Sequence, residues 1–205
     1  MTRTLLATLA VLVAGTFAFS RLTHGFTVLT AESARRQAVA RAPIAIPELI
    51  GIDQQGQRRG LIDKADDRVV IVDFIYTRCT SICSVLGGSY QQMQAAIEEA
   101  HLEHAVRLVT VSFDPMHDTR AVIYDYSRRL RANPNLWTIL TPLDTGALRR
   151  TLTVFGLVTT PAPQGQFIHN AAFHIIDRQG RLARIIDISQ PREALAAALR
   201  LYRAP

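Results

Sequence analysis

The stretch that decides the fold is residues 68–84, which read RVVIVDFIYTRCTSICS. Its first part is a continuous run rich in β-branched and aromatic residues, which is typical of a strand buried on both faces of a sheet. Its second part carries both cysteines of the chain, Cys79 and Cys83, and a helical pattern continues to about His101. The cysteines are therefore expected where a buried strand ends and a helix begins, the place at which α/β sheets present their ligands.

Strand and helix patterns continue to alternate through the rest of the chain. Short strands are expected within 47–56 around a Gln/Gly turn, and a hairpin is expected about Gln179-Gly180. The other expected elements are strands at 106–113 and 137–141, helices at 118–130, 144–155 and 191–202, and the hairpin strands at 172–177 and 182–187. This order predicts an α/β fold, a thioredoxin-like mixed sheet flanked by helices.

Composition limits the class of protein. With 205 residues, 48% hydrophobic and 20% charged, the chain is expected to form one folded domain with an appendage. Two cysteines exclude a disulfide-rich scaffold, an all-cysteine zinc site and an iron–sulfur cluster. The net charge of +6 comes almost entirely from arginines in isolated pairs with carboxylates between them, so nucleic-acid binding is not expected.

Residues 4–20 read TLLATLAVLVAGTFAFS and carry no charge. As a helix they would extend about 25 Å, which is enough to span a membrane. The segment is either an uncleaved anchor, which we favour, or a cleaved signal peptide with a poor cleavage site at Thr16-Phe17-Ala18. The arginines that follow it oppose an exported domain under the positive-inside rule, but long domains are exported largely regardless of such charges. We therefore predict a single-pass protein of the cytoplasmic membrane, with its folded domain in the periplasm or otherwise outside the membrane.

The C-x3-C spacing allows the two cysteines to act together. At i and i+4 of a helix they share one face, about 5–6 Å apart at Cβ, so both sulfurs could hold one ion or join each other. The helix start and Arg78 favour the thiolate state. Two thiolates and one imidazole satisfy three-coordinate Cu(I), whereas a structural zinc ion requires four ligands. The structural alternatives are two inert buried cysteines, or a disulfide closing a loop too small to stabilise much.

Several segments, taken in order, resemble the Sco/SenC copper-chaperone family. They are Tyr76–Cys83, Val111–Thr119, Trp137–Thr141, Phe155-Gly156 and His169. The resemblance implies a membrane-anchored thioredoxin fold, facing the periplasm or intermembrane space, that binds copper. Such proteins help assemble the binuclear copper centre (CuA) of cytochrome c oxidase subunit II by delivering copper, by reducing that subunit's cysteines, or both.

The resemblance also implies a ligand set. Carried over residue by residue, Cys79 and Cys83 are the two sulfur ligands of copper and His169 is the imidazole ligand, with Asp114 beside the metal site. The resemblance covers about residues 46–205. We accordingly assign 1–21 to the membrane anchor or signal segment, 22–45 to a linker and 46–205 to the thioredoxin-like copper-binding domain.

Three positions depart from the family pattern. Thr80 and Ser84 stand where the family has prolines after each cysteine, and Ile168 stands where it has Asp before the histidine. Losing the prolines frees two backbone donors and loosens the loop, which favours redox exchange over metal retention. The alternative function is therefore a thiol-disulfide oxidoreductase in which Cys79 attacks and Cys83 resolves. A peroxidase is disfavoured because no peroxide pocket is evident, and an interaction protein would require inaccessible cysteines.

The other histidines have simple structural explanations. Without the resemblance, the residues favour His169 as a turn residue before a strand, hydrogen-bonded to the backbone, over a metal ligand. His174 falls on the opposite face of a regular strand and is expected in the core or at an edge. His101 and His104 lie at a helix end among carboxylates and are expected in solvent.

The segment after the second buried strand holds four further candidates. Met116 and His117 could supply a soft or an imidazole ligand from a loop. Asp114 either supports the metal site or caps a turn. Asp118 is expected to cap the following helix.

Overall fold

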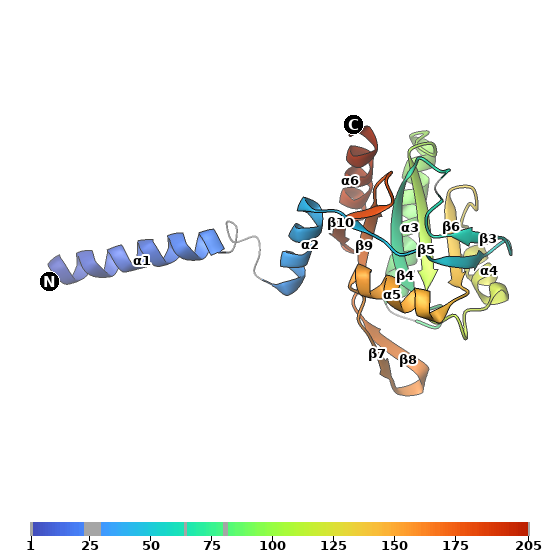
Figure 1. The fold of residues 1–205 in the computed structure, drawn as a ribbon, viewed down its shortest axis with the longest axis horizontal. Helices are drawn as coiled ribbons and strands as arrows, with labels where there is room; N and C mark the ends of the chain where they lie inside the picture. The colour runs from blue at the N-terminus through green and yellow to red at the C-terminus, as the bar shows by residue number, and fades with distance from the viewer. Residues whose placement is uncertain (1, 23–29, 64, 80–81, 205) are drawn as a thin grey trace. The chain divides into compact units, whose positions relative to one another are not determined.

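The computed structural model describes residues 2–22, 30–63, 65–79 and 82–204, and the side chains of 2, 3, 22 and 82–84 lie outside that description. The chain divides into two compact units, residues 1–41 and 42–205. The first unit contains two helices, α1 (Thr2–Leu22) and α2 (Ala31–Arg41). The second unit contains the sheet and every predicted site residue (Figure 1).

Helix α1 is long and apolar enough to cross a membrane. Its window Thr4–Arg21 has a mean hydropathy of 1.6, and none of that window is buried. A signal sequence near the N-terminus has the same properties, so the anchor and the signal peptide both remain compatible with α1. Helix α2 covers 11 residues of the segment 22–45 that the sequence assigns to a linker.

Eight strands of the second unit form one mixed sheet in the order β1-β10-β9-β4-β5-β6-β2-β3. Their bounds are β1 Ile44–Ala45, β2 Ile50–Asp53, β3 Arg58–Gly60, β4 Val69–Ile75, β5 Val106–Ser112, β6 Trp137–Pro142, β9 Ala172–Ile176 and β10 Arg181–Asp187. The central strands β4, β5 and β6 run parallel, with Val69 opposite Val106 and Leu108 opposite Trp137. All seven residues of β4 and of β5 are buried, as a central parallel pair requires.

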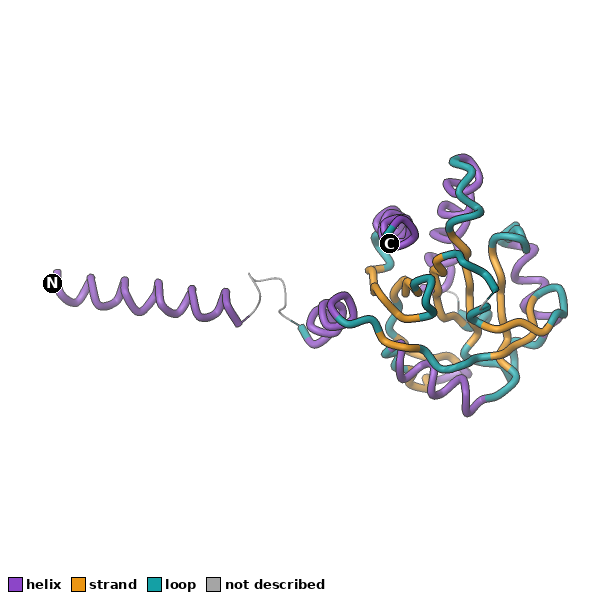
Figure 2. Tube along the Cα trace, turned by 45° about the horizontal axis from the view of Figure 1, so that its top comes forward, coloured by secondary structure: helices purple, strands orange, loops and turns teal. Residues whose placement is uncertain are grey.

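Helices cover both faces of this sheet, with the strands between them (Figure 2). Their bounds are α3 Ile82–Glu99, α4 Arg120–Arg129, α5 Thr145–Phe155 and α6 Pro191–Arg203. Tyr90 of α3 packs on Phe173, whereas Phe155 of α5 packs on the next residue, His174. Because neighbouring residues of a strand point to opposite faces, α3 and α5 cover opposite faces of the sheet.

The predicted fold class is confirmed, since the sheet is mixed and flanked by helices in the expected order. One element was not predicted. Strands β7 (Thr159–Ala162) and β8 (Gln166–His169) form a separate two-stranded hairpin, joined by a short 3-10 turn at Pro163–Gly165. This hairpin projects from the sheet in Figure 1. His169 is the last residue of β8 and pairs with Thr159, the first residue of β7, at the base of the hairpin.

Candidate functional site

The cysteine segment follows the central strand directly. Strand β4 ends at Ile75, and the amide of Cys79 donates to the carbonyl of Tyr76 at 3.2 Å, which makes a tight turn. Cys79 is half-buried, and Cys83 is the second residue of α3. The predicted strand-to-helix junction is therefore confirmed for the backbone. Thr80 and the side chains of Cys83 and Ser84 lie outside the described residues.

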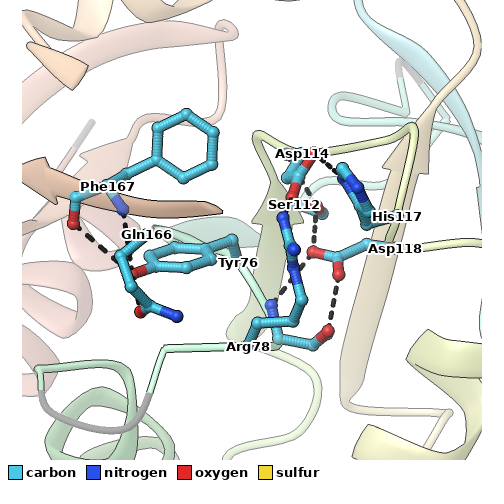
Figure 3. A network of polar contacts seen from close by, with 9 residues as sticks. Tyr76, Arg78, Ser112, Asp114, His117, Asp118, Gln166 and Phe167 are labelled. Atoms are coloured by element: carbon cyan, nitrogen blue, oxygen red, sulfur yellow. Dashed lines mark hydrogen bonds and ion pairs between the residues drawn. The ribbon is translucent and has the colours of Figure 1, made fainter. Parts of the chain in front are cut away.

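Asp118 holds the turn before Cys79 in place. Its carboxylate is fully buried and accepts hydrogen bonds from the Thr77 amide (3.0 Å), the Thr77 hydroxyl (2.5 Å) and the Ser112 hydroxyl (2.5 Å) (Figure 3). The prediction that Asp118 caps a helix was wrong, because the residue before α4 is Thr119 and it makes no side-chain cap bond. Asp118 instead ties the end of β4 to the end of β5.

Asp114 connects the cysteine segment to the loop after β5. Its Oδ2 accepts from Arg78 Nη2 at 2.8 Å, and its Oδ1 lies 2.8 Å from His117 Nδ1 (Figure 3). Asp114 therefore supports the segment that carries Cys79 as well as forming its own turn. The ion pair offsets the positive charge of Arg78, so Arg78 stabilises thiolates less than the sequence indicated. Met116 points into solvent, with 80% of its surface exposed.

Tyr76 joins the hairpin to the cysteine segment. Its hydroxyl donates to Gln166 Oε1 at 2.8 Å and accepts from the Phe167 amide at 3.2 Å (Figure 3). Its ring also lies edge-on to His169, with centroids 5.9 Å apart. One side chain, three residues before Cys79, therefore contacts the strand that carries His169.

Aromatic side chains contact the imidazole of His169. The ring of Phe113, which follows β5, lies 5.0 Å from it and 5.6 Å from the ring of Phe167. Burial lowers the pKa of His169, and a hydrogen bond to the carbonyl of Asn170 offsets this only in part. Nδ1 lies 3.0 Å from that carbonyl, so Nδ1 carries the proton of the neutral ring and Nε2 carries the lone pair. This is the state in which histidine binds a metal, oriented by a carbonyl as metal-bound histidines commonly are.

The structure brings His169 to the end of the sheet at which Cys79 lies. Both residues contact Tyr76, one through the backbone turn and the other through the ring. Within the described side chains, which do not include that of Cys83, no three His, Cys, Asp or Glu groups are arranged to hold a metal. The ligand set of Cys79, Cys83 and His169 therefore stays a prediction.

Three other histidines among the described residues lie elsewhere. His174 is buried, with Nε2 3.2 Å from the carbonyl of Phe155, as expected for a core residue. His101 is exposed at the end of α3. His104 lies edge-on to Tyr202, with centroids 6.0 Å apart. Neither of these two contacts involves the cysteine segment.

Sequence reasoning missed Tyr76 and Gln166 as site residues and assigned Asp118 the wrong role. A usable signal was present for Asp118, since two aspartates four residues apart follow a buried strand that ends beside the cysteines. No comparable signal marks Gln166, because its bond to Tyr76 spans 90 residues.

The fold and this site define a thioredoxin-like protein with a pair of cysteines where its central strand passes into a helix. The chain belongs to the SCO1/SenC family, whose model matches residues 48–203. It is 22% identical over 134 residues to the SCO1 protein homolog of Bacillus subtilis (strain 168), which covers 64% of this chain and 68% of that protein.

Solved structures of the family share the fold. BsSco, described as a member of the Sco family of cytochrome c oxidase assembly proteins, superposes with a TM-score of 0.67 at 18% identity, over 80% of this chain and 96% of that one. The ScoI protein of Bradyrhizobium japonicum, solved with copper bound, gives 0.59 at 24% identity, over 77% and 99%.

Proposed function

We propose that this chain is a membrane-anchored copper-binding protein of cytochrome c oxidase assembly. It delivers copper to the CuA site of subunit II, or keeps the cysteines of that site reduced, and its partners are subunit II and other copper-handling proteins. The observation that carries this proposal is the placement of a neutral, oriented imidazole, His169, against the same Tyr76 that begins the Cys79 turn.

Copper is the cargo in this proposal, and Cys79, Cys83 and His169 are its ligands. Two thiolates and a neutral imidazole around Cu(I) give a net charge of −1, which the amide groups at the start of α3 help to offset. Each thiol loses a proton when it binds the metal, so copper binding releases protons. The low pKa of His169 means that the imidazole itself has no proton to lose at neutral pH.

The location follows from α1. We infer that α1 anchors the protein in the cytoplasmic membrane as a single span and that residues 46–205 fold in the periplasm, where subunit II would present its copper site. The support is an apolar helix of sufficient length at the N-terminus, followed by a separate folded unit.

The test is a copper titration of the full-length protein in detergent, in competition with a chromophoric Cu(I) chelator. His169→Ala should weaken copper retention at least tenfold, while His104→Ala, which alters a histidine away from the cysteine segment, should leave it unchanged. Equal retention by His169→Ala and the unaltered protein would contradict copper binding through this site.

The alternative is a thiol-disulfide oxidoreductase, favoured by Thr80 and Ser84 in place of the family's prolines. In that case Cys79 attacks a disulfide of the partner and forms a mixed disulfide with it. Cys83 then attacks the sulfur of Cys79, which releases the partner as a dithiol and leaves this chain with a Cys79–Cys83 disulfide. His169→Ala would then leave turnover on an oxidised partner almost unchanged, whereas Cys79→Ser would abolish it.

A further inference from the structure

A cavity of about 680 Å³ lies at the end of the sheet opposite the cysteine segment. Its lining includes Val70 near the start of β4, Arg107 near the start of β5 and Ile176 at the end of β9. From Val70 to the end of β4, where the chain turns toward Cys79, the strand extends about 16 Å. The cavity is therefore separate from the candidate copper site, and its volume is in the range of small-molecule sites in proteins.

Helix α5 covers the same face of the sheet nearer to the cysteines. Val70 pairs with Arg107 on one side and with Ile176 on the other, so these three side chains point to one face. Phe74, four residues further along β4, points to that face as well and packs on Phe155 of α5, with ring centroids 5.0 Å apart. At the cavity, irregular chain and a turn take the place of the helix.

One wall of the cavity is apolar. The irregular segment before β2 contributes Ile46, Pro47 and Leu49, and the loop after β3 contributes Ile62. Branched and ring side chains of this kind bind ligands by removing their apolar groups from water.

Arg107 places a buried guanidinium beside this wall, with only 5% of its surface exposed. Within the described residues it makes one hydrogen bond, from Nη2 to the carbonyl of Leu61 at 2.8 Å, although it has five N–H groups. Its Nε lies 3.6 Å from Asp66 Oδ2, which is too long for a hydrogen bond. Burial lowers the pKa of Arg107, and the charge of Asp66 offsets this in part. A buried cation with unused donors favours a ligand that supplies an oxygen acceptor.

Most other charged side chains that line the cavity are already engaged. Asp66 accepts two hydrogen bonds from Arg68, at 2.7 and 2.8 Å. Asp177 pairs with Arg181 at 2.8 Å, and Arg178 is also in an ion pair. These groups balance one another and leave no net charge for a ligand to neutralise.

Two carboxylates on the solvent side of the cavity are different. Glu48 and Asp63 are exposed, and no ion pair joins either of them to another described residue. Asp63 is close enough to Arg107 for its charge to raise the pKa of that guanidinium. The cavity therefore presents a buried cation, an apolar wall and two outer carboxylates.

We propose that this cavity binds a zwitterion with apolar side groups, of the size of a dipeptide. The ligand carboxylate accepts from the guanidinium of Arg107, its ammonium group lies against Glu48 and Asp63, and its side groups contact the apolar wall. A simple anion would be repelled by the two outer carboxylates, and a simple cation would leave Arg107 unpaired. Binding involves no covalent step, and the proposal does not depend on copper.

The test is a ligand-observed NMR titration of the full-length protein in detergent with leucyl-leucine, a dipeptide that dissolves in water. The dissociation constant should be of the order of 0.1–1 mM. N-acetyl-leucyl-leucine lacks the ammonium group and leucyl-leucine amide lacks the carboxylate, so each should bind at least tenfold more weakly. Equal binding of the three peptides would overturn the proposal, as would the absence of dipeptide binding at about 10 mM.

Variants of the lining assign the binding to this cavity. Arg107→Gln should weaken dipeptide binding at least tenfold, because it removes the buried cation. Glu48→Gln changes an exposed position and covers the case in which Arg107→Gln does not fold; it should weaken binding about threefold. The matched control is Glu99→Gln, an exposed carboxylate at the end of α3 and outside the cavity lining, which should leave the affinity unchanged.

Equal affinities in Glu48→Gln and Glu99→Gln would contradict the assignment of the ammonium group, and full affinity in a folded Arg107→Gln would contradict that of the carboxylate. Copper retention should be the same in the unaltered protein and in Glu48→Gln. Failure of the dipeptide to bind, with copper retained, would overturn this proposal and leave the proposed function standing.

Discussion

The two sides of the candidate site are held in different ways. On the cysteine side, the buried carboxylate of Asp118 accepts three hydrogen bonds and joins the ends of β4 and β5. On the histidine side, β7 and β8 form their own small sheet, and neither strand contains a buried residue. The hairpin is connected to the cysteine segment through the hydroxyl of Tyr76 and a few aromatic contacts.

For the ligand set proposed above, this difference predicts which ligand exchanges more readily. The turn before Cys79 is tied to the buried carboxylate of Asp118, whereas a hairpin with few buried contacts opens at low cost. We expect His169 to be the ligand that leaves first when copper passes to a partner. Changes on the cysteine side should therefore reduce stability, and changes on the histidine side should reduce copper retention.

The largest effect is expected from Asp118→Ala. The change leaves the amide and hydroxyl of Thr77 and the hydroxyl of Ser112 without their acceptor in a buried setting, which should lower the free energy of unfolding by about 3–5 kcal/mol. Chemical denaturation measures it, with Asp125→Ala, an exposed aspartate on α4, as the control. A loss as small as that of the control would show that the cysteine side is not held by this carboxylate.

Tyr76→Phe should have a smaller effect on stability and a clear effect on copper. It removes the hydroxyl that bonds to Gln166 and Phe167 but keeps the ring against His169, so the free energy of unfolding should fall by about 1 kcal/mol. Copper retention, measured by chelator competition, should fall several-fold because the hairpin is held less firmly. The control is Tyr124→Phe, at a partly exposed tyrosine. Unchanged copper retention in Tyr76→Phe would contradict the expectation that the histidine side controls how firmly copper is held.

The core of this fold could be predicted from sequence because its patterns are local. Strands β4 and β5 are buried along all seven of their residues and are rich in Val and Ile, and the helix between them, α3, keeps a helical period. The hairpin could not be predicted in the same way. Residues 159–169 contain two prolines and a glycine, and β7 and β8 pair with each other outside the main sheet, so no buried alternation marks them.

The sequence predicts a set of candidate site residues, which stays a prediction, but not the contacts that hold them. Cys79, Cys83 and His169 follow from motifs and resemblance. The role of Tyr76 depends on a partner 90 residues away, which no local pattern encodes, and that of Asp118 depends on Thr77, 41 residues away. An aspartate directly before a helix is typical of a cap, but the Asp118 carboxylate bonds to Thr77 and Ser112 instead.

Gly165→Ala tests the tip of the hairpin. Gly165 has φ +69°, in the left-handed region, and a Cβ there would lie 3.1 Å from Arg78 Nη1. Alanine should cost about 1 kcal/mol locally and displace either the tip or the Arg78 side chain. Amide hydrogen exchange should therefore be faster in β7 and β8, with the thermal midpoint almost unchanged. Gly88→Ala, a helical position with open space around it, should not change exchange in the hairpin. Equal exchange in both variants would show that the tip does not depend on Arg78.

The smallest effect is expected from the titration of His169. Its pKa in the folded protein is lowered, chiefly by burial, so between pH 6.5 and the folded pKa the unfolded chain binds more protons than the native one. The free energy of unfolding should therefore decrease as the pH falls through this window. Below the window, the unaltered protein and His169→Asn should show the same dependence of stability on pH. His169→Asn should show a shallower decrease between pH 7 and pH 5 in chemical denaturation, while His104→Ala should keep the original slope. A slope unaffected by His169→Asn would mean that the ring is as well solvated as in the unfolded chain, and the histidine side would then be even less ordered than its aromatic contacts indicate.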